Sequence, residues 1–180
     1  MDEAIIEGLK NGSLVRATGA NLCMADFEGA ELQGIELTDC DLRGARFRGA
    51  DLRGARLRHC SMRMARFEGA DLRGADLSKS IVRMVNLNNA NLGCADLGAA
   101  DLGGSLVEGA DFFGARFSAT VLGRLDLSQA KNLDNANHAG PSSIGVDTIV
   151  MSRGTIPDVF LRGCGVPDYL IAAFRDLIPK

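Results

Sequence analysis

The sequence predicts an all-β solenoid, and a five-residue period is the main reason. From Leu22 to Leu127 every fifth residue is Leu, Phe, Met or Val, which makes 22 consecutive apolar positions. The residue two places before each of them is usually small, and it is Ala in 14 of the 22 units. A strict short repeat of this kind is typical of solenoids, in which each repeat packs only against its neighbours.

The spacing of the repeat excludes ordinary helices and strands. A helix places its apolar face at spacings of three and four residues, and a strand alternates with a period of two. Here the inward positions fall alternately two and three residues apart, as in Ala50, Leu52 and Ala55. A chain that turns a corner once in each repeat keeps this pattern inside, and four repeats close a square coil.

The repeated units, such as those at 50–54 and 90–94, resemble the A(D/N)LXX units of the pentapeptide-repeat proteins. The resemblance covers residues 15–130. It implies a right-handed quadrilateral β-helix of about five and a half coils, with the central Leu or Phe and the small residue pointing inward and Asp or Asn facing out. Gly at the second position after the centre, as in Gly44, suits a corner that needs permissive backbone angles.

Three segments follow from this pattern: an N-terminal helical cap at 1–14, the β-helix at 15–130, and a linker with short helices at 131–180. Residues 2–10 are expected to form the first helix and to cover the first coil. After Leu127 the register breaks, and 139–143 is expected to be a linker.

Short helices are expected in the tail. One runs from Pro157 through Arg162, with Thr155 at its N-cap position. The last one opens at Asp168, and its apolar stripe is expected either to cap the last coil or to form a homodimer contact. The residues of this stripe and its edge are Tyr169, Leu170, Ile171, Phe174 and Leu177.

Two inward columns carry residues other than Leu and Ala. Steps of four repeats place Phe27, Phe47 and Phe67 in one stack inside the shaft. Cys40 and Cys60 stack in a column of small residues, where they fill the space of Ala. A disulfide between them is geometrically conceivable. The absence of CxxC pairs, of a signal peptide and of a long apolar run predicts a reduced, cytoplasmic protein.

The net charge of −3 hides a segregation along the rod. Residues 1–40 carry eight acidic and two basic residues, 41–90 carry five acidic and eleven basic ones, and 91–130 carry five acidic and two basic ones. The middle coils should therefore bear a basic band. The arginines expected in vertical ladders are Arg43, Arg63 and Arg83 on one face, and Arg46 and Arg66 on the next.

Two interpretations of this band are open. It is either a surface for anions or nucleic acid, or a solvated surface in which arginines pair with Asp51, Asp71 and Asp76. The flanking acids and the lack of exposed aromatic residues favour the second, because nucleic-acid grooves usually interleave stacking aromatics.

Apolar residues also interrupt the outer face of the Arg43 ladder. Ile81 and Val121 replace an outward acid, and Met64 and Met84 replace a corner Gly; Leu106 is a similar break on the next face. Exposed apolar patches often mark contacts. The C-terminal segment, a second subunit or a partner is expected to cover this patch.

No chemistry of an enzyme is apparent in the sequence. His59 and His138 are isolated, no His/Cys cluster has the spacing of metal ligands, and no nucleophile or phosphate-binding motif occurs. The chain is therefore expected not to be an enzyme and to need no cofactor.

The expected function is a non-enzymatic interaction scaffold or regulatory module with a protein partner, and neither nucleic acid nor membrane is expected to bind. One alternative is a DNA-mimicking inhibitor of DNA gyrase or topoisomerase, as among quinolone-resistance relatives in the family. The positive middle coils argue against it, because a mimic of duplex phosphates needs continuous negative potential. The other alternative is anion or nucleic-acid binding through the arginine band.

Residues 143–149 and 156–167 resemble a segment that precedes TIR signalling domains in some bacterial multidomain proteins. This resemblance implies either a stand-alone relative or the N-terminal part of a bacterial signalling protein. In the second case any NAD-cleaving chemistry would lie outside these 180 residues.

Overall fold

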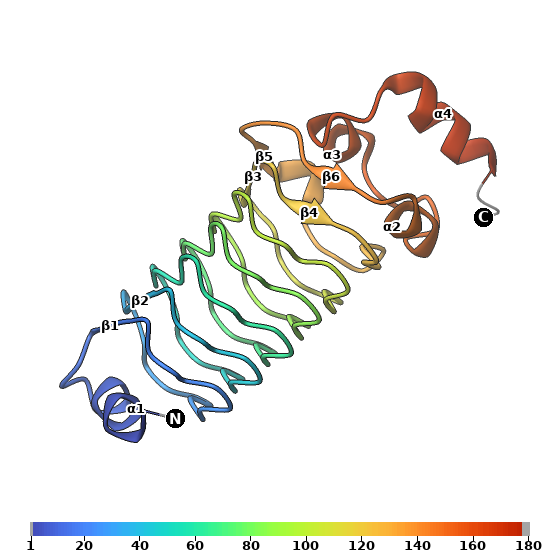
Figure 1. The fold of residues 1–180 in the computed structure, drawn as a ribbon. Coiled ribbons are helices and arrows are strands. Elements are labelled where there is room, and N and C mark those ends of the chain that lie inside the picture. The colour runs from blue at the N-terminus through green and yellow to red at the C-terminus, as the bar shows by residue number, and fades with distance from the viewer. Residues whose placement is uncertain (1, 178–180) are drawn as a thin grey trace.

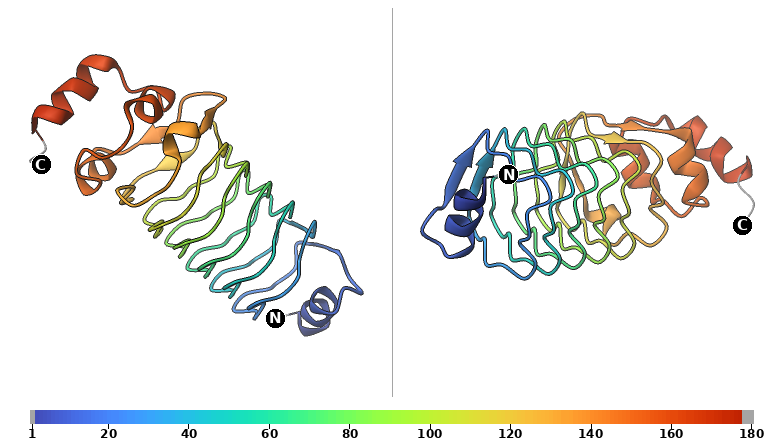
Figure 2. Two further views of the ribbon diagram at one scale, coloured as in Figure 1. Left: turned by 180° about the vertical axis from the view of Figure 1, so that it is seen from behind. Right: turned by 60° about the horizontal axis from the view of Figure 1, so that its bottom comes forward.

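A computed structural model describes residues 2–177 and shows a rod of stacked coils between two helical ends (Figure 1). The two ends of the chain lie at opposite ends of the rod in every view (Figure 2). The elements follow in the order α1 (Glu3–Lys10), β1 (Arg16–Thr18), β2 (Glu36–Thr38), β3 (Arg116–Phe117), β4 (Val121–Leu122), η1 (Leu133–Asn135), β5 (Asn137–His138), β6 (Ser143–Ile144), α2 (Val146–Met151), α3 (Asp158–Gly163) and α4 (Asp168–Leu177).

The coils have the predicted length of four repeats. Strand β1 pairs in parallel with β2, and single parallel bridges then join residues that lie four repeats apart, from Asn21–Asp41 to Asp111–Lys131. Each side of a coil contributes only one bridging residue before the chain turns, so few residues form regular strands. The handedness of the coil stays a prediction.

The central column of the repeat forms the core, as predicted. All 22 central residues from Leu22 to Leu127 are 3% exposed or less. The rings of Phe27, Phe47 and Phe67 stack with centroid distances of 5.0 and 4.7 Å. Each buried Leu or Phe contributes about 1.5–3 kcal/mol, so the stability of the rod comes mainly from these columns.

The corners explain the abundance of Gly. The second residue after the centre has a left-handed backbone in unit after unit, for example Gly44 with a φ of 66°. Non-glycine residues adopt the same conformation where they occupy this position, among them Met64 at 58° and Met84 at 54°. A side chain there costs roughly 1–2 kcal/mol, so these two Met residues are unfavourable for the backbone.

Buried hydroxyl groups replace a backbone bond at some corners. The Ser80 hydroxyl donates to the Leu57 carbonyl at 2.6 Å and accepts the amide of Cys60 at 3.0 Å. Thr148, in α2, repeats this arrangement with the Leu122 carbonyl and the Leu125 amide. Helix α2 is therefore joined to the last coil by the same type of bond that joins coils to each other.

Cys40 and Cys60 are both free thiols and both buried. The Cys60 thiol donates to the Leu37 carbonyl at 3.3 Å, and the Cys40 thiol lies 3.6 Å from the Ala17 carbonyl. These carbonyls belong to the preceding coil, as the Leu57 carbonyl does for Ser80. The thiols thus fill the small-residue column as expected, without a disulfide.

The coil continues beyond residue 130, which corrects the prediction of a linker at 139–143. Strand β5 pairs with β3 in parallel, with Asn137 opposite Arg116, and β6 pairs with β4, with Ser143 opposite Val121. The separation of Arg116 and Asn137 is one residue longer than four repeats, and that of Val121 and Ser143 is two residues longer. The additional residues are absorbed at the corners, so the sequence period is lost while the pairing persists. The Ser143 amide still donates to the Thr120 carbonyl at 2.8 Å, as in a regular coil.

Helices cover both ends of the rod. In α1, Leu9 is buried, and Ile5 and Ile6 pack partly against the first coil. The Asp2 carboxylate accepts the Asn21 amide at 2.7 Å, which ties this end to the ladder. Figure 1 shows α1 lying across the open end of the first coil.

At the other end, α2 and α3 cover the last coil. The N-cap of α3 is Pro157 and not Thr155, because the extended ψ of 137° at Pro157 marks the last non-helical residue. Phe160 packs its edge against Phe117 with a centroid distance of 5.3 Å. Helix α4 lies beyond α3 (Figure 1), so the prediction that the last helix caps the last coil is wrong.

His138 is enclosed at this junction. Its ring stacks on Phe117 at 5.6 Å and meets the edge of Phe160 at 4.9 Å. Both ring nitrogens are buried and have no hydrogen-bond partner within residues 2–177. Burial lowers the pKa of His138 below its ordinary value of 6.5.

The chain should therefore lose stability as the pH falls below 6.5. In this range the unfolded chain binds a proton that the folded chain rejects, so the free energy of unfolding falls and then levels off below the folded pKa. The free energy of unfolding should change by well below ~1.4 kcal/mol per pH unit, because the His138 ring is only half-buried. Urea unfolding curves recorded between about pH 5 and pH 8 measure this pH dependence of the free energy of unfolding.

His138→Phe keeps the aromatic volume and should remove this part of the pH dependence. His59→Asn is the matched control, because His59 is an exposed corner residue with a φ of 56° that Asn tolerates. Equal pH slopes for the wild type and His138→Phe would show that His138 does not titrate between the two states.

Candidate interaction surface

Ion pairs neutralise most of the arginine band. The distances for pairs on the two predicted ladders are 2.6 Å for Arg43–Asp41, 2.7 Å for Arg46–Asp26, 3.0 Å for Arg66–Glu68 and 3.1 Å for Arg83–Asp101. Arginines at 53, 58 and 73 pair with Asp51, Asp76 and Asp71, as the second interpretation predicted. Because each coil stacks directly on the one before it, the acidic block at 1–40 lies next to the basic block.

The carboxylates respond to these pairs. Hydrogen bonds from the neighbouring guanidinium groups hold the pKa values of Asp26, Asp41, Asp51 and Asp71 below their usual range. The pairs are exposed to solvent, and such pairs contribute about 0–1 kcal/mol each. They set the charge pattern of the surface more than the stability of the rod.

Arg63 differs from the arginines above and below it. It forms no ion pair with any residue that the structure describes, whereas Arg43 and Arg83 each form one. The column beside it explains this difference, because Asp41 and Asp101 flank their arginines but Ser61 and Ile81 stand beside Arg63. Arg63 therefore carries an uncompensated positive charge between apolar side chains.

The predicted apolar patch is exposed. Met64 is 62%, Met84 52%, Ile81 41% and Val121 37% exposed. The C-terminal segment up to residue 177 leaves Met64 and Ile81 exposed, and it reaches the predicted patch through Met151, which lines a groove with Met84 and Leu106. A second subunit or a partner stays a prediction.

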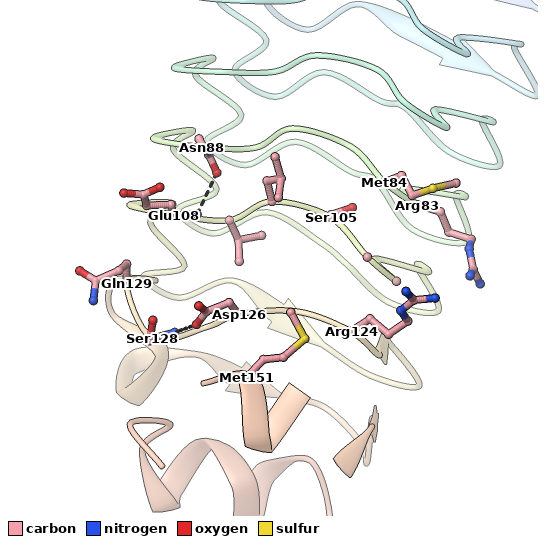
Figure 3. Close-up of a pocket in the computed structure, with 14 residues that line it drawn as sticks. Arg83, Met84, Asn88, Ser105, Glu108, Arg124, Asp126, Ser128, Gln129 and Met151 are labelled. Carbon is pink, nitrogen blue, oxygen red and sulfur yellow. Dashed lines mark hydrogen bonds between the residues drawn. The ribbon is translucent and has the colours of Figure 1, made fainter. Parts of the chain in front are cut away.

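The structure adds residues that the sequence did not single out. Met24 stands on the column of Met64 and Met84, and it is also exposed with a left-handed backbone. Met151 of α2 (Figure 3) lines the same groove as Leu106. The column of Met24 is visible at every fourth repeat, but nothing in the sequence places Met151 beside the coils.

The stripe of α4 is divided between the interior and the surface. Ile171 is buried and Phe174 is half-buried, and both line a small cavity with Ile149, Ile156 and Leu161. Leu170 is half-buried and Tyr169 is 73% exposed. The side chain of Leu177 lies outside the described residues. Part of the stripe therefore packs within the chain, and a homodimer contact through this helix stays a prediction.

Two kinds of site are absent among residues 2–177. No group of three or more His, Cys, Asp or Glu side chains is placed to hold a metal ion there. No helix of this part of the chain has the length and hydropathy needed to cross a membrane.

Comparisons with known proteins support the repeat. A family model described as pentapeptide repeats matches residues 15–44, 35–74, 50–89 and 70–109, which together span more than half of the chain. A search of curated proteins found no match. The resemblance of the tail to a segment before TIR domains has no counterpart in these comparisons and stays a prediction.

Several solved structures are similar. A pentapeptide repeat protein from the thylakoid lumen of Arabidopsis thaliana is 37% identical, over 58% of this chain and 69% of that one, with a TM-score of 0.42. HetL, a pentapeptide repeat protein of the cyanobacterium Nostoc involved in heterocyst differentiation regulation, is 24% identical over 72% of this chain and 89% of that one (TM-score 0.38). QnrB1, a plasmid-mediated fluoroquinolone resistance protein, is 19% identical over 74% and 85% (TM-score 0.42). With its unbroken five-residue register and this family match, the chain belongs to the pentapeptide-repeat family.

Proposed function

We propose that the chain is a non-enzymatic interaction or regulatory module, built on a right-handed four-sided β-helix, that binds a protein partner in a reducing cytoplasm. Pentapeptide-repeat proteins are generally structural or interaction proteins, and this role fits the family. The observation that carries the proposal is an exposed apolar patch on one face of the rod, defined by Met64, Ile81 and Met84. We call it the Met64 patch.

The backbone conformation of Met64 and Met84 supports the proposal. Met64 and Met84 occupy left-handed corners, where Gly would avoid a cost of roughly 1–2 kcal/mol. Both side chains are more than half exposed, so packing within the chain offsets only part of that cost. Flexible Met side chains are common at protein-binding surfaces. Contact with a partner is the simplest compensation for an unfavourable backbone with an exposed apolar side chain.

Arg63 adds a feature that a partner can recognise. It lies beside Ile81 in the same shallow depression, and it has no ion pair within residues 2–177. A partner with an apolar surface and a carboxylate at its edge would match both groups. A charge at the rim of an apolar contact affects the rate and specificity of association more than its affinity.

The two alternatives are less well supported. A DNA mimic needs a continuous acidic surface, and the arginines of the middle coils interrupt it. Binding of nucleic acid needs free positive charge, but the neighbouring carboxylates neutralise most of these arginines. A gyrase supercoiling assay tests the first alternative, and inhibition at submicromolar protein would favour it over our proposal. The tail resemblance adds the proposal that the module works beside a signalling domain.

The proposal is tested with a variant that restores the repeat. Met64→Gly places the preferred residue at the corner, and Ile81→Asp places the acid found at positions 41 and 101 of the same column. The double variant should keep its stability or gain up to about 1 kcal/mol. Partners cross-linked in cells that make the protein, quantified by mass spectrometry, should fall at least about tenfold.

The control is Val15→Asp, which changes an exposed apolar residue outside the patch. Its partners should match those of the wild type. The proposal fails if the wild type enriches no protein over the control chain, or if the double variant enriches the same protein equally well. Light scattering on all three chains shows whether the partner is a second copy.

A further inference from the structure

The ladder of bridges opens at one position. From β1 to β4, each bridging residue pairs with the next coil, except Leu106, which bridges back to Asn86 but not forward to Asp126. The bridges on either side, Asp101–Val121 and Asp111–Lys131, are intact. The opening is therefore confined to one side of one coil.

The preceding coil shows which groups lose their partners. There the Leu87 amide donates to the Leu106 carbonyl at 2.8 Å, and the Leu106 amide donates to the Val85 carbonyl at 2.9 Å. In the next coil the same pattern requires the Val107 amide to donate to the Asp126 carbonyl, and the Asp126 amide to donate to the Ser105 carbonyl. Neither bond is present in the described chain. Two amides and two carbonyls therefore face each other across the opening without partners.

Helix α2 lies on the other side of the segment around Asp126 and is bonded to it. The Leu125 amide donates to the Thr148 hydroxyl at 3.1 Å, and the Leu127 amide donates to the Ser152 hydroxyl at 2.9 Å. These two bonds hold the segment around Asp126 against the helical end of the chain.

The opening is the floor of a groove with a volume of about 570 Å³ (Figure 3). Met84, Leu106 and Met151 line it, and each of them is exposed. Gly103 stands where the preceding coils carry Arg43, Arg63 and Arg83, and the guanidinium group of Arg83 lies over it. The volume lies within the range of ~300–1,000 Å³ that is usual for ligand sites.

The charges of the groove are separated along its length. Arg83 and Arg124 lie at one end, Glu108 lies at the other beside Gln129, and Asp126 lies between the two ends (Figure 3). Arg124 forms no ion pair with a residue of the described chain, and Arg83 has a single partner, Asp101. An occupant with a carboxylate at one end would meet two guanidinium groups.

We propose that this groove binds an extended peptide segment of a partner protein, which completes the open ladder and places an acidic residue against Arg83 and Arg124. Unpaired strand edges bind extended peptides through main-chain hydrogen bonds, while pockets for alternate side chains give specificity. Val107 and Asp126 supply the donors, Ser105 and Asp126 supply the acceptors, and the apolar lining receives side chains. The proposal rests on the proposed interaction function, and the groove shares Met84 with the Met64 patch.

The probe is a phage-displayed library of random twelve-residue peptides, selected on the full chain. A selected peptide is then synthesised, and its binding is measured by fluorescence anisotropy. Gly103→Arg fills the groove with a residue that the same column carries in earlier coils, and it should weaken binding at least about tenfold. Cys23→Arg makes the same addition at the far end of that column and should leave binding unchanged.

Two further measurements test the main-chain contacts. N-methylation of alternate peptide amides should weaken binding at least about tenfold if the peptide completes the ladder. In hydrogen exchange, the amides of Val107 and Asp126 should exchange faster than that of Leu87 in the free chain, and they should become protected on binding.

Each contrary outcome has a clear meaning. Protected amides at Val107 and Asp126 in the free chain show that the ladder is closed, and they overturn the proposal. So does failure to select any peptide, or peptide binding that Gly103→Arg leaves unchanged. Self-association that Gly103→Arg abolishes identifies a second copy as the occupant instead. Loss of cellular partners in the Met64→Gly/Ile81→Asp chain bears on the proposed function. Because neither changed residue lines the groove, peptide affinity retained by that same chain separates this failure from a failure of the groove proposal.

Discussion

Phe47→Ala is expected to destabilise the rod by about 3–5 kcal/mol, the usual cost of removing a fully buried aromatic ring. Phe47 is the middle ring of a stack of three and has no exposed surface. Its loss leaves a void that neither neighbour can fill, because Phe27 and Phe67 are fixed by their own coils. Since coils pack only against their neighbours, the defect should interrupt the cooperativity of the rod at its centre.

Urea melts followed by circular dichroism measure the change in the free energy of unfolding. Phe113→Ala is the matched control, because it makes the same chemical change on the outer surface. Phe113 is 54% exposed. It should alter stability by less than about 0.5 kcal/mol. Equal losses in the two variants would contradict the assignment of Phe47 to the core.

Phe160→Ala is expected to release the C-terminal helices while the coils stay folded. Phe160 is buried and packs against Phe117 and His138, which belong to the last coil. Removing its ring should cost about 3–5 kcal/mol of local stability. Few other aromatic contacts join α3 to the rod, so the loss should concentrate at this junction.

Hydrogen exchange resolves the two parts of the chain. Amides of α2 and α3 should lose protection in Phe160→Ala, whereas those of coils near residues 40–80 should keep it. Exposure of the last coil should also promote association between chains, since an uncovered β edge is a template for pairing. Tyr169→Ala, in the same tail but 73% exposed, serves as the control. Unchanged protection of α3 would show that Phe160 does not hold the end in place.

The sequence predicts the coil and the core because the repeat allows little else. Any residue on the central column has a neighbour of the same kind four repeats away, so the period places all of them inside without knowledge of the structure. The Phe27–Phe47–Phe67 stack follows from the same step. The ion pairs of Arg53 and Arg73 follow from the acids beside them.

The end of the rod could not be predicted in this way. In the last coil the paired residues are one or two positions further apart in the sequence than in the regular coils. The period therefore disappears while the pairing continues. The groove could not be predicted from the sequence for a related reason. Leu106 and Asp126 are in perfect register in the sequence, so nothing in the sequence shows that the bridge between them is missing.

The constant separation of four repeats between ladder partners has a consequence for how the chain folds. Each coil closes a loop of the same length, from Asn21–Asp41 to Asp111–Lys131. Because the entropy of loop closure depends on loop length, an added coil brings another loop of equal cost and not a longer one. The mean separation of contacting residues, relative to chain length, therefore falls as such a rod grows. A solenoid of this design becomes longer without requiring contacts between more distant parts of its sequence.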